Sequence, residues 1–290
     1  MKVCGFTIIR NAIKFDYPVI ESIHSILPIC DEFVVAVGNS DDETLALIQS
    51  INSPKIKIIQ TTWDDNLRIG GHVLADETNK AMDAISNDVD WCFYIQSDEV
   101  VHEKYLPNIK KAMQAQLEDP KVEGLLFNYT HFYGSYDFVG ISRSWYKNEI
   151  RIIRNNKSIR SYKDAQGFRK NGEKLNVKKV DASIYHYGWV KHPKYQQAKQ
   201  LSFNKMWHDN NWIDNNVKKV DEFDYSNIDI LQKFEENHPK TMENRIKNVN
   251  WSFSFDPTQN SLSIKSKLLH FIENRLNYQF GEYKNYHLIK

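Results

Sequence analysis

The 290-residue sequence predicts an α/β fold with a mostly parallel sheet, followed by a helical C-terminal extension. Three observations predict this fold. Short apolar runs alternate with helical patterns over the first hundred residues, as in parallel strands joined by helices. The loops after these runs carry acidic residues or glycine, as at the ligand-binding edge of such a sheet. Beyond residue 193 helical patterns dominate.

The first hundred residues divide into four strands and three helices. Apolar, β-branched runs predict strands at residues 3–9, 33–37, 55–60 and 91–95. Apolar residues at intervals of three and four predict helices at 18–27, 45–51 and 74–85. Asp16 is expected to cap the first helix, with Pro18 in its first turn and Pro28 after its end.

The middle of the chain is expected to add a helix at 106–117 and strands at 122–132, 151–154 and 182–187. Residues 133–149 are rich in Tyr, Gly, Ser and Trp without a clear period, which predicts a functional loop or lid. Helices are expected at 195–208, 228–234 and 261–280. We expect this extension to pack on the core, the alternative being a surface that docks on a membrane or a partner.

The composition excludes several classes of protein. Hydrophobic residues make up 41% of the chain, enough for a proper core, and a net charge of +1 argues against nucleic-acid binding. No apolar stretch approaches the roughly 18 residues of a membrane span, so any membrane contact is expected to be peripheral. The three cysteines have no metal-like spacing and are expected to be buried thiols of a cytoplasmic protein.

Charge is distributed unevenly along the chain. Residues 31–103 contain fifteen Asp or Glu against four Lys or Arg, whereas residues 143–179 contain twelve Lys or Arg against three Asp or Glu. This pattern fits one part that holds cations and another that meets anions, although a solvated charge bias is the alternative. Cations that could contact a diphosphate or an anionic acceptor are Arg143, Lys147, Arg151, Arg154 and Arg169.

The stretch from Trp91 to Glu99 is the most informative part of the sequence. An apolar run predicts a buried strand, and Gln96-Ser97-Asp98-Glu99 follows it. Carboxylates at the end of such a strand can present a cation to a ligand. The alternative is a solvated acidic turn.

Several short motifs follow one another along the predicted strands and helices. They are Ile8-Ile9-Arg10-Asn11, Ser40-Asp41-Asp42-Glu43-Thr44, Trp63-Asp64-Asp65, Asn79-Lys80-Ala81, the acidic motif ending in Asp98, Asp164-Ala165-Gln166-Gly167-Phe168, and His186-Tyr187-Gly188. In this order they resemble the motifs of family-2 glycosyltransferases with the GT-A fold. The resemblance covers roughly residues 3–192. It implies a three-layer GT-A domain at 1–192, with a nucleotide-binding half (1–103) and an acceptor-binding half (104–192), followed by the extension at 193–290.

The resemblance implies a metal-dependent inverting glycosyltransferase. Such an enzyme moves a sugar from a nucleotide-diphosphate sugar to a hydroxyl of a glycan or lipid-linked acceptor, here at the cytosolic face of the membrane. Asp98 and His186 would hold Mn²⁺ or Mg²⁺, and Asp164 would be the general base, with Asp137 as its competitor. The donor-binding residues would be Thr7, Arg10, Asn11, Gly38, Asp65, Asn79, Gln96 and Ser97. Trp145 and Tyr133, with Tyr136, are expected to form an aromatic platform for the acceptor.

The chain also departs from the family pattern. Gln96 stands where the family usually has the first Asp of its metal motif, and Val37-Gly38 replaces the acidic turn that contacts the base. The sequence therefore does not identify the nucleotide of the donor. Two other functions remain: a nucleotidyltransferase, although residues 10–14 lack the glycine-rich loop expected of one, and a non-catalytic module that binds sugar nucleotides or glycans.

Overall fold

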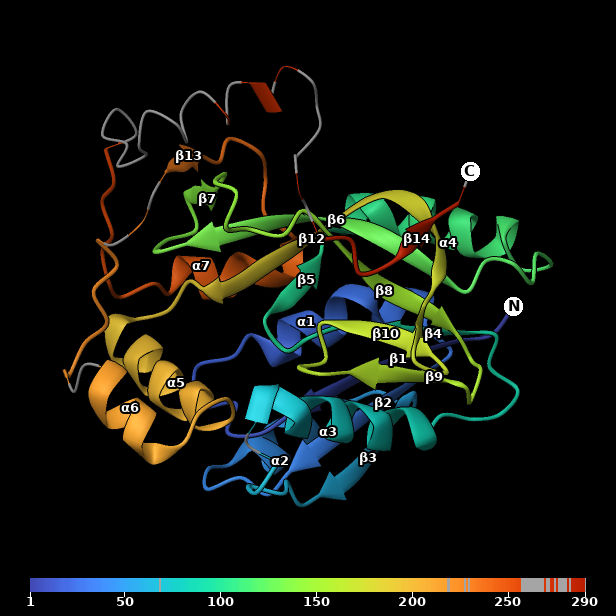
Figure 1. Cartoon of the computed structure of the whole chain (residues 1–290), viewed down its shortest axis with the longest axis horizontal. Coiled ribbons are helices and arrows are strands. Elements are labelled where there is room, and N and C mark those ends of the chain that lie inside the picture. Colours follow the sequence, from blue (N-terminus) through green and yellow to red (C-terminus); the bar gives the residue numbers. More distant parts are fainter. Residues whose placement is uncertain are drawn as a thin grey trace.

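The computed structural model describes residues 1–67, 69–217, 220–226, 228, 230–256, 269, 272, 273, 275, 281 and 283–289. In these residues the chain forms an α/β fold around a mixed, mostly parallel sheet of eleven strands, with a smaller three-stranded sheet beside it (Figure 1). The helix predicted at 261–280 lies almost entirely outside the described residues.

Four parallel strands form one half of the large sheet, as the sequence predicted. They are β1 (Val3–Ile9), β2 (Glu32–Gly38), β3 (Ile56–Thr61) and β4 (Trp91–Tyr94), in the order β3-β2-β1-β4. Because these strands are parallel, their carboxyl ends meet at one edge of the sheet. The polar loops that follow them are therefore brought together.

The two faces of the large sheet are covered by different elements. Alternate residues of β1 are buried on opposite faces, which explains why the strand is apolar throughout. Helices α1 (Val19–Ile26), α2 (Thr44–Gln49) and α4 (Leu106–Ala115) pack on one face. The other face carries α3 (His72–Asp83) and the small sheet of β9 (Ile159–Tyr162), β10 (Gly167–Lys170) and β11 (Glu173–Lys174).

The second half of the large sheet is mixed in direction. Strand β8 (Asn148–Arg154) runs antiparallel between β4 and β6 (Gly124–Tyr133). The long strand β12 (Asn176–Trp189) runs parallel to β6 and antiparallel to the short β5 (Glu99–Val101). The pairing of β12 with β5 sets His186 opposite Glu99. His186 is thereby brought close to the acidic residues that follow β4.

The C-terminal segment is less helical than predicted. Helices α5 (Pro193–Lys205), α6 (Asn210–Asn216) and α7 (Glu243–Lys247) are present. The helix predicted at 228–234 is wrong, because β13 (Leu231–Lys233) pairs there with the edge strand β7 (Phe138–Gly140). Strand β14 (His287–Leu288) pairs with β12, so the segment joins the sheet in two places.

Smaller corrections concern turns and helix ends. The helix α1 begins at Val19 with Pro18 at its cap position, and Asp16 instead forms an ion pair with Arg245. Short 3₁₀ helices are η1 (Leu27–Ile29), η2 (Ile69–Gly71), η3 (Glu103–Tyr105) and η4 (Lys240–Met242). The three cysteines are free and buried, as predicted. Within the described part of the chain, no helix is both long enough and apolar enough to cross a membrane.

Candidate functional site

Asp98 and His186 lie side by side at the end of β4. The carboxylate Oδ1 of Asp98 is 3.8 Å from Nε2 of His186. The backbone of the two segments is joined next to this pair, because the Tyr187 amide donates to the Asp98 carbonyl at 2.8 Å. Both side chains are about nine-tenths buried. The pairing of β5 with β12 therefore brings together Asp98 and His186, which are far apart in the sequence.

The second oxygen of Asp98 is bound by a lysine of α5. The Lys199 ammonium donates to Asp98 Oδ2 at 3.0 Å and to the Gly188 carbonyl at 2.9 Å. Burial opposes ionisation of Asp98, but Lys199, His186 and Lys191 together hold its pKa below the usual range. Burial lowers the pKa of Lys191 to about 7, with Lys199 adding to the effect. Asp98 is therefore the anionic centre of a cation-rich environment.

A pair of histidines fixes the protonation of His186. His131 Nε2 lies 2.7 Å from the Tyr146 carbonyl, which can only accept, so this nitrogen carries a hydrogen. Burial lowers the pKa of His131 to about 3, so its Nδ1 is an acceptor. The Nδ1 atoms of the two histidines are 3.0 Å apart, and the hydrogen between them therefore belongs to His186. Burial lowers the pKa of His186 to about 4, although Asp98 raises it, so His186 is neutral at pH 7 and its Nε2 faces Asp98 without a hydrogen.

The space beside these two electron-pair donors depends on Gly188. A Cβ placed on Gly188 would lie 2.6 Å from His186 Nε2 and 2.8 Å from Asp98 Oδ2. Any other residue at this position would crowd both atoms. An unprotonated imidazole nitrogen beside a carboxylate oxygen is a donor set that Mn²⁺ or Mg²⁺ accepts. The pair thus fits a divalent cation.

The protein alone offers few ligands for such a cation. Among the described residues there is no group of three or more His, Cys, Asp or Glu side chains placed to hold a metal. Gln96, which replaces a carboxylate, is half-buried and held through its backbone: its amide donates to Glu99 at 3.0 Å and its carbonyl accepts from Ser22 at 2.9 Å. Ser97 is also half-buried. Further ligands for a cation would have to come from a bound molecule.

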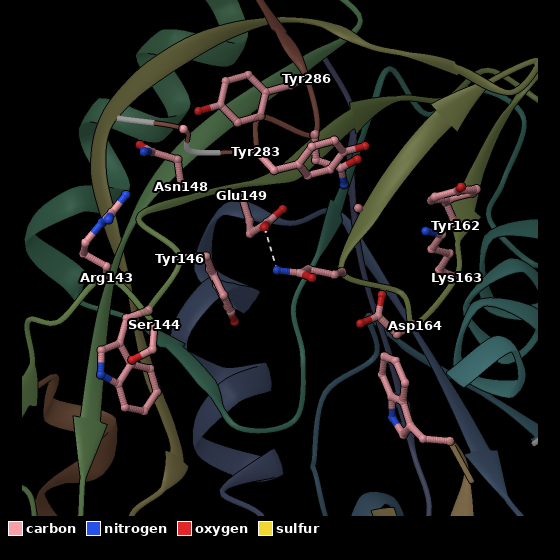
Figure 2. Close-up of a pocket in the computed structure, with 16 residues that line it drawn as sticks. Arg143, Ser144, Tyr146, Asn148, Glu149, Tyr162, Lys163, Asp164, Tyr283 and Tyr286 are labelled. Atoms are coloured by element: carbon pink, nitrogen blue, oxygen red, sulfur yellow. Dashed lines mark hydrogen bonds between the residues drawn. The ribbon is translucent and has the colours of Figure 1, made fainter. Parts of the chain in front are cut away.

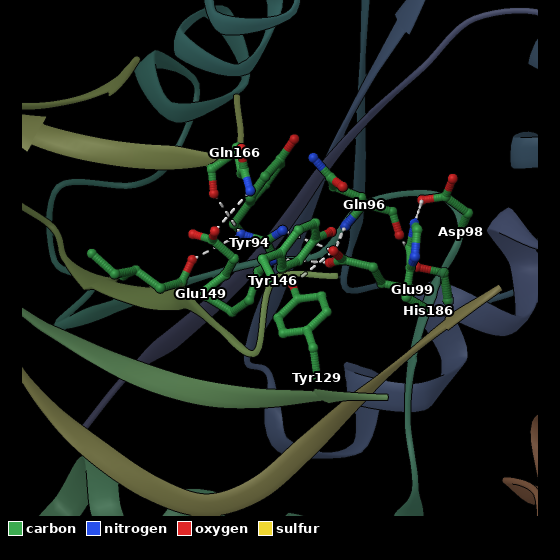
Figure 3. Close-up of polar contacts among 12 residues, drawn as sticks. Tyr94, Gln96, Asp98, Glu99, Tyr129, Tyr146, Glu149, Gln166 and His186 are labelled. Atoms are coloured by element: carbon green, nitrogen blue, oxygen red, sulfur yellow. Dashed lines mark hydrogen bonds and ion pairs between the residues drawn. The ribbon is translucent and has the colours of Figure 1, made fainter. Parts of the chain in front are cut away.

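A buried ion pair supports the loop that carries Asp98. Arg151 of β8 binds Glu99 with two hydrogen bonds of 2.9 and 2.8 Å, and both side chains are fully buried. Tyr129 donates to the same carboxylate at 2.7 Å (Figure 3). Glu99 also accepts from the Gln96 amide, so the pair fixes the turn that carries Asp98. The negative charge of Glu99 is therefore balanced by Arg151 inside the protein.

Several predicted donor-binding residues gather at the carboxyl ends of β1, β2 and β3. Arg10 donates to the Asn39 carbonyl and to Asp65, each at 2.9 Å, and its guanidinium carbon lies 5.7 Å from the centroid of the Trp63 ring. At Gly38 a Cβ would lie 2.3 Å from the Trp63 indole nitrogen. A flat aromatic ring, a guanidinium and an exposed carboxylate thus share one edge of the sheet.

Three other predicted donor residues have structural partners. Asn11 Oδ1 accepts from the Asp41 amide at 2.9 Å, which closes the loop at this edge. Thr7 is fully buried inside β1. Asn79 Oδ1 accepts from the Ser161 amide at 2.9 Å, which ties α3 to β9. Thr7 and Asn79 therefore have roles within the fold, and their contact with a donor stays a prediction.

Three arginines of the basic segment are bound within the fold. Arg151 is bound to Glu99, as described above. Arg154 donates to the carbonyls of Leu117 and Val122 and lies over the Trp91 ring. Arg169 is mostly buried and donates to the backbone. Internal acceptors therefore occupy the guanidinium groups of these three arginines, and a contact between this segment and an anion stays a prediction.

A pocket of about 500 Å³ lies beside β8 and β10 (Figure 2). Its lining includes Trp145, Tyr146, Asn148, Glu149, Asp164 and Gln166. Two of the predicted site residues, Asp164 and Trp145, are therefore in the same pocket. Tyr133 does not line it, because its ring packs among Trp145, Trp189 and Tyr225. Tyr136 packs against Tyr187 and is buried.

Asp164 is separated from the Asp98 and His186 pair. No hydrogen bond or ion pair joins it to either of these two described residues. Tyr146 lies between the two regions, since it lines the pocket and its ring centroid is 6.4 Å from that of His186 (Figure 3). Burial raises the pKa of Asp164. The three residues expected to converge thus form a contacting pair and a third residue in the adjoining pocket.

Sequence reasoning missed three residues of this region. Lys199 and His131 gave no signal, because their partners depend on how α5 and β6 dock. Glu149 gave a signal that was not used: in the apolar strand 148–154, Glu149 and Arg151 stand two positions apart and so share one face. Two charged residues on one face of a buried strand indicate a polar contact or a site.

Comparison with known proteins identifies a distant likeness of fold. No family model and no curated protein sequence matches the chain. Among solved structures, TarS of S. aureus is similar with a TM-score of 0.41 and 14% identity, over 70% of this chain and 39% of that one. Glucosyl-3-phosphoglycerate synthase of Mycobacterium tuberculosis, in complex with Mn²⁺ and UDP-glucose, gives 0.30 and 15%, over 45% and 44%.

The fold of a third solved structure is similar to that of this chain to a comparable degree. The 4-diphosphocytidyl-2C-methyl-D-erythritol synthase of Anaerococcus prevotii gives a TM-score of 0.35 and 10% identity, over 53% of this chain and 70% of that one. TarS is also known in complex with UDP. The chain spans well under two thirds of the length of TarS. None of the site assignments depends on these likenesses.

Proposed function

We propose that the protein is an inverting glycosyltransferase that uses a nucleotide-diphosphate sugar as donor. The donor nucleotide would lie along the edge formed by Arg10, Gly38 and Asp65, and its diphosphate would reach Asp98 and His186. The acceptor would be a hydroxyl of a glycan or a lipid-linked glycan. We further propose that residues 1–192 carry the transferase unit and that 193–290 extend it, with action at the cytosolic face of a membrane through peripheral contact.

The observation that carries this proposal is the bare Nε2 of His186 at 3.8 Å from the Asp98 carboxylate. Two electron-pair donors that face each other without a hydrogen between them are stabilised by a shared cation. Gly188 leaves the space beside them open. We therefore propose that Asp98 and His186 hold Mn²⁺ or Mg²⁺ together with oxygens of the donor diphosphate.

The cation would stabilise the negative charge that develops on the departing diphosphate. The chain's own residues hold the groups in place for this step. His131 keeps the His186 ring oriented through the 3.0 Å contact between the Nδ1 atoms. Lys199 is within reach of the same region and adds a positive charge near the Asp98 oxygen. The pair of Glu99 and Arg151 keeps the turn rigid.

Asp164 is the proposed general base. Inversion requires a base that removes the proton of the acceptor hydroxyl while that oxygen attacks from the face opposite the leaving group. A position in the pocket next to the Asp98 region, across Tyr146, suits this role better than a position beside the cation. Its raised pKa brings the carboxylate closer to the pKa expected of an efficient base at neutral pH.

Replacing Asp164 by Asn tests the catalytic part of the proposal. The variant should bind the donor among UDP-, GDP-, CDP- and dTDP-sugars as the wild type does, but its rate of transfer should fall by about 100-fold or more. The measurement compares calorimetric donor affinity with turnover, and Asp137→Asn tests the competing candidate in the same assays. Full activity of Asp164→Asn would show that the base is another residue. Donor binding without turnover in the wild type would indicate a binding module instead.

A further inference from the structure

The pocket beside β8 contains a buried carboxyl group that the proposed transfer step does not use. Glu149 is 4% exposed and lines the pocket, and its Oε1 accepts a hydrogen bond of 2.8 Å from Gln166 (Figure 2). Its Oε2 has no hydrogen-bond partner within the described part of the protein. The same holds for Asn148 Oδ1 and for the indole nitrogens of Trp145 and Trp207, and all three residues line the pocket.

Buried polar atoms without partners are rare in folded proteins, because each one costs the free energy of its lost hydrogen bond to water. Four such atoms on residues that line one pocket therefore indicate a ligand with several hydrogen-bonding groups. The four atoms also complement each other chemically. The indole nitrogens of Trp145 and Trp207 can only donate, Asn148 Oδ1 can only accept, and a carboxyl group can do either, depending on its protonation.

The surroundings of Glu149 keep it protonated. Burial raises the pKa of Glu149 to about 8. The nearby carboxylates of Glu99 and Asp164 also raise this pKa, whereas Arg151 and the hydrogen bond from Gln166 lower it. Arg151 is already engaged by Glu99, and this limits its effect on Glu149. At neutral pH the carboxyl group is neutral, and Oε2 carries a hydrogen that it can donate.

The rest of the lining is aromatic and amide in character. Tyr146, Tyr162, Tyr283 and Trp207 contribute aromatic rings, and Gln166 contributes an amide. Of the two cations in the lining, Arg143 pairs with Glu273 at 3.2 Å and the Lys163 ammonium lies 5.3 Å from the Tyr162 ring centroid. Aromatic faces with a few hydrogen-bonding groups suit a ring that has both C–H faces and hydroxyls.

We propose that this pocket binds an uncharged sugar ring of the acceptor and that Glu149, as a neutral acid, donates a hydrogen bond to a hydroxyl or acetamido oxygen of that ring. The inference rests on the proposed function, because it names the acceptor class for the same site. Glu149 acts in binding, whereas Asp164 removes the proton. Ionised Glu149 would present two acceptor oxygens and lose the donated hydrogen bond, so the ring would bind less tightly.

The test measures binding of three probes by calorimetry or saturation-transfer NMR between pH 6.5 and pH 9. The probes are methyl β-glucoside, methyl β-N-acetylglucosaminide and methyl β-glucosaminide. At least one of the two uncharged glycosides should bind the wild type, about tenfold more weakly at pH 9 than at pH 7, since the neutral acid is lost as pH rises through about 8. The cationic glucosaminide should bind less well than the better uncharged probe.

Two variants of Glu149 separate a binding role from a structural one. Glu149→Gln keeps a donor and an acceptor without a titratable proton, so its affinity should match the wild type at pH 7 and show no alkaline loss. Glu149→Leu should bind about five- to tenfold more weakly than the wild type at pH 7, as expected for one lost hydrogen bond, and its affinity should not change between pH 7 and pH 9. Glu173→Gln, an exposed residue of β11, is the control and should behave as the wild type.

Three results would overturn the inference. They are an equal alkaline loss in Glu149→Gln, tighter binding of the glucosaminide than of both uncharged probes, and failure of all three probes to bind. Donor binding is measured separately with UDP and UDP-glucose. A protein that binds these nucleotides but no glycoside contradicts the acceptor inference alone, whereas a protein that binds glycosides but no nucleotide contradicts the proposed function.

Discussion

Replacing Arg151 by Met should lower the free energy of unfolding by about 3–5 kcal/mol, the largest effect on stability that we expect from a single substitution in this region. The reason is the charge that remains. Arg151 and Glu99 are both fully buried, so removal of the guanidinium leaves an unpaired carboxylate without water. Denaturant unfolding monitored by circular dichroism measures the change.

A surface ion pair supplies the matched control for this prediction. Arg160 and Asp83 form an ion pair with side chains 41% and 55% exposed, so Arg160→Met should cost less than about 1 kcal/mol. Adding Glu99→Gln to Arg151→Met removes the unpaired charge and should recover part of the loss. If Arg151→Met unfolds within about 1 kcal/mol of the wild type, the pair does not hold the turn that carries Asp98.

Replacing Asp98 by Asn should weaken Mn²⁺-dependent binding of a nucleoside diphosphate by about 100-fold or more, because a direct ligand contributes at least as much as the outer partners of a metal site. The amide also leaves the buried Lys199 without its counter-charge. Circular dichroism must therefore confirm that the variant is folded before its affinity is compared. Asp88→Asn, at an exposed carboxylate, is the control.

Two neighbouring variants make the Asp98 prediction more specific. Gly188→Ala keeps both proposed ligands but places a methyl group near 2.6 Å from His186 Nε2, so it should also weaken metal-dependent binding. Lys199→Met frees Asp98 Oδ2 from its ion pair, so it should bind Mn²⁺ more tightly when no nucleotide is present. If Gly188→Ala binds as the wild type does, the cation does not occupy this space.

The parallel half of the fold could be predicted because its signals are local. Each of the strands β1 to β4 is an apolar run, and the helices between them repeat their apolar residues at helical spacing. The end of β4 also lies at the edge of the sheet where the sequence placed Asp98. These features depend on residues that are close in the chain, and a periodic pattern records them directly.

The missed elements depend on contacts between distant segments. Residues 231–233 form a strand only because β7 offers an unpaired edge, and their apolar spacing alone favoured a helix. Arg151 looked like a surface cation because the sequence does not show that Glu99 lies opposite it on another strand. Lys199 sits on a helix with no distinctive pattern, and only the docking of α5 brings it to Asp98.

The most direct test of the proposed function is a calorimetric titration of the wild-type protein with UDP, GDP, CDP and dTDP, each with and without Mn²⁺. Since Asp98 and His186 supply only two protein ligands, Mn²⁺ alone should bind weakly, and at least one nucleotide should bind at least tenfold more tightly in its presence. This gain should disappear in Asp98→Asn. No metal-dependent gain for any of the four nucleotides would contradict a donor site at Asp98 and His186.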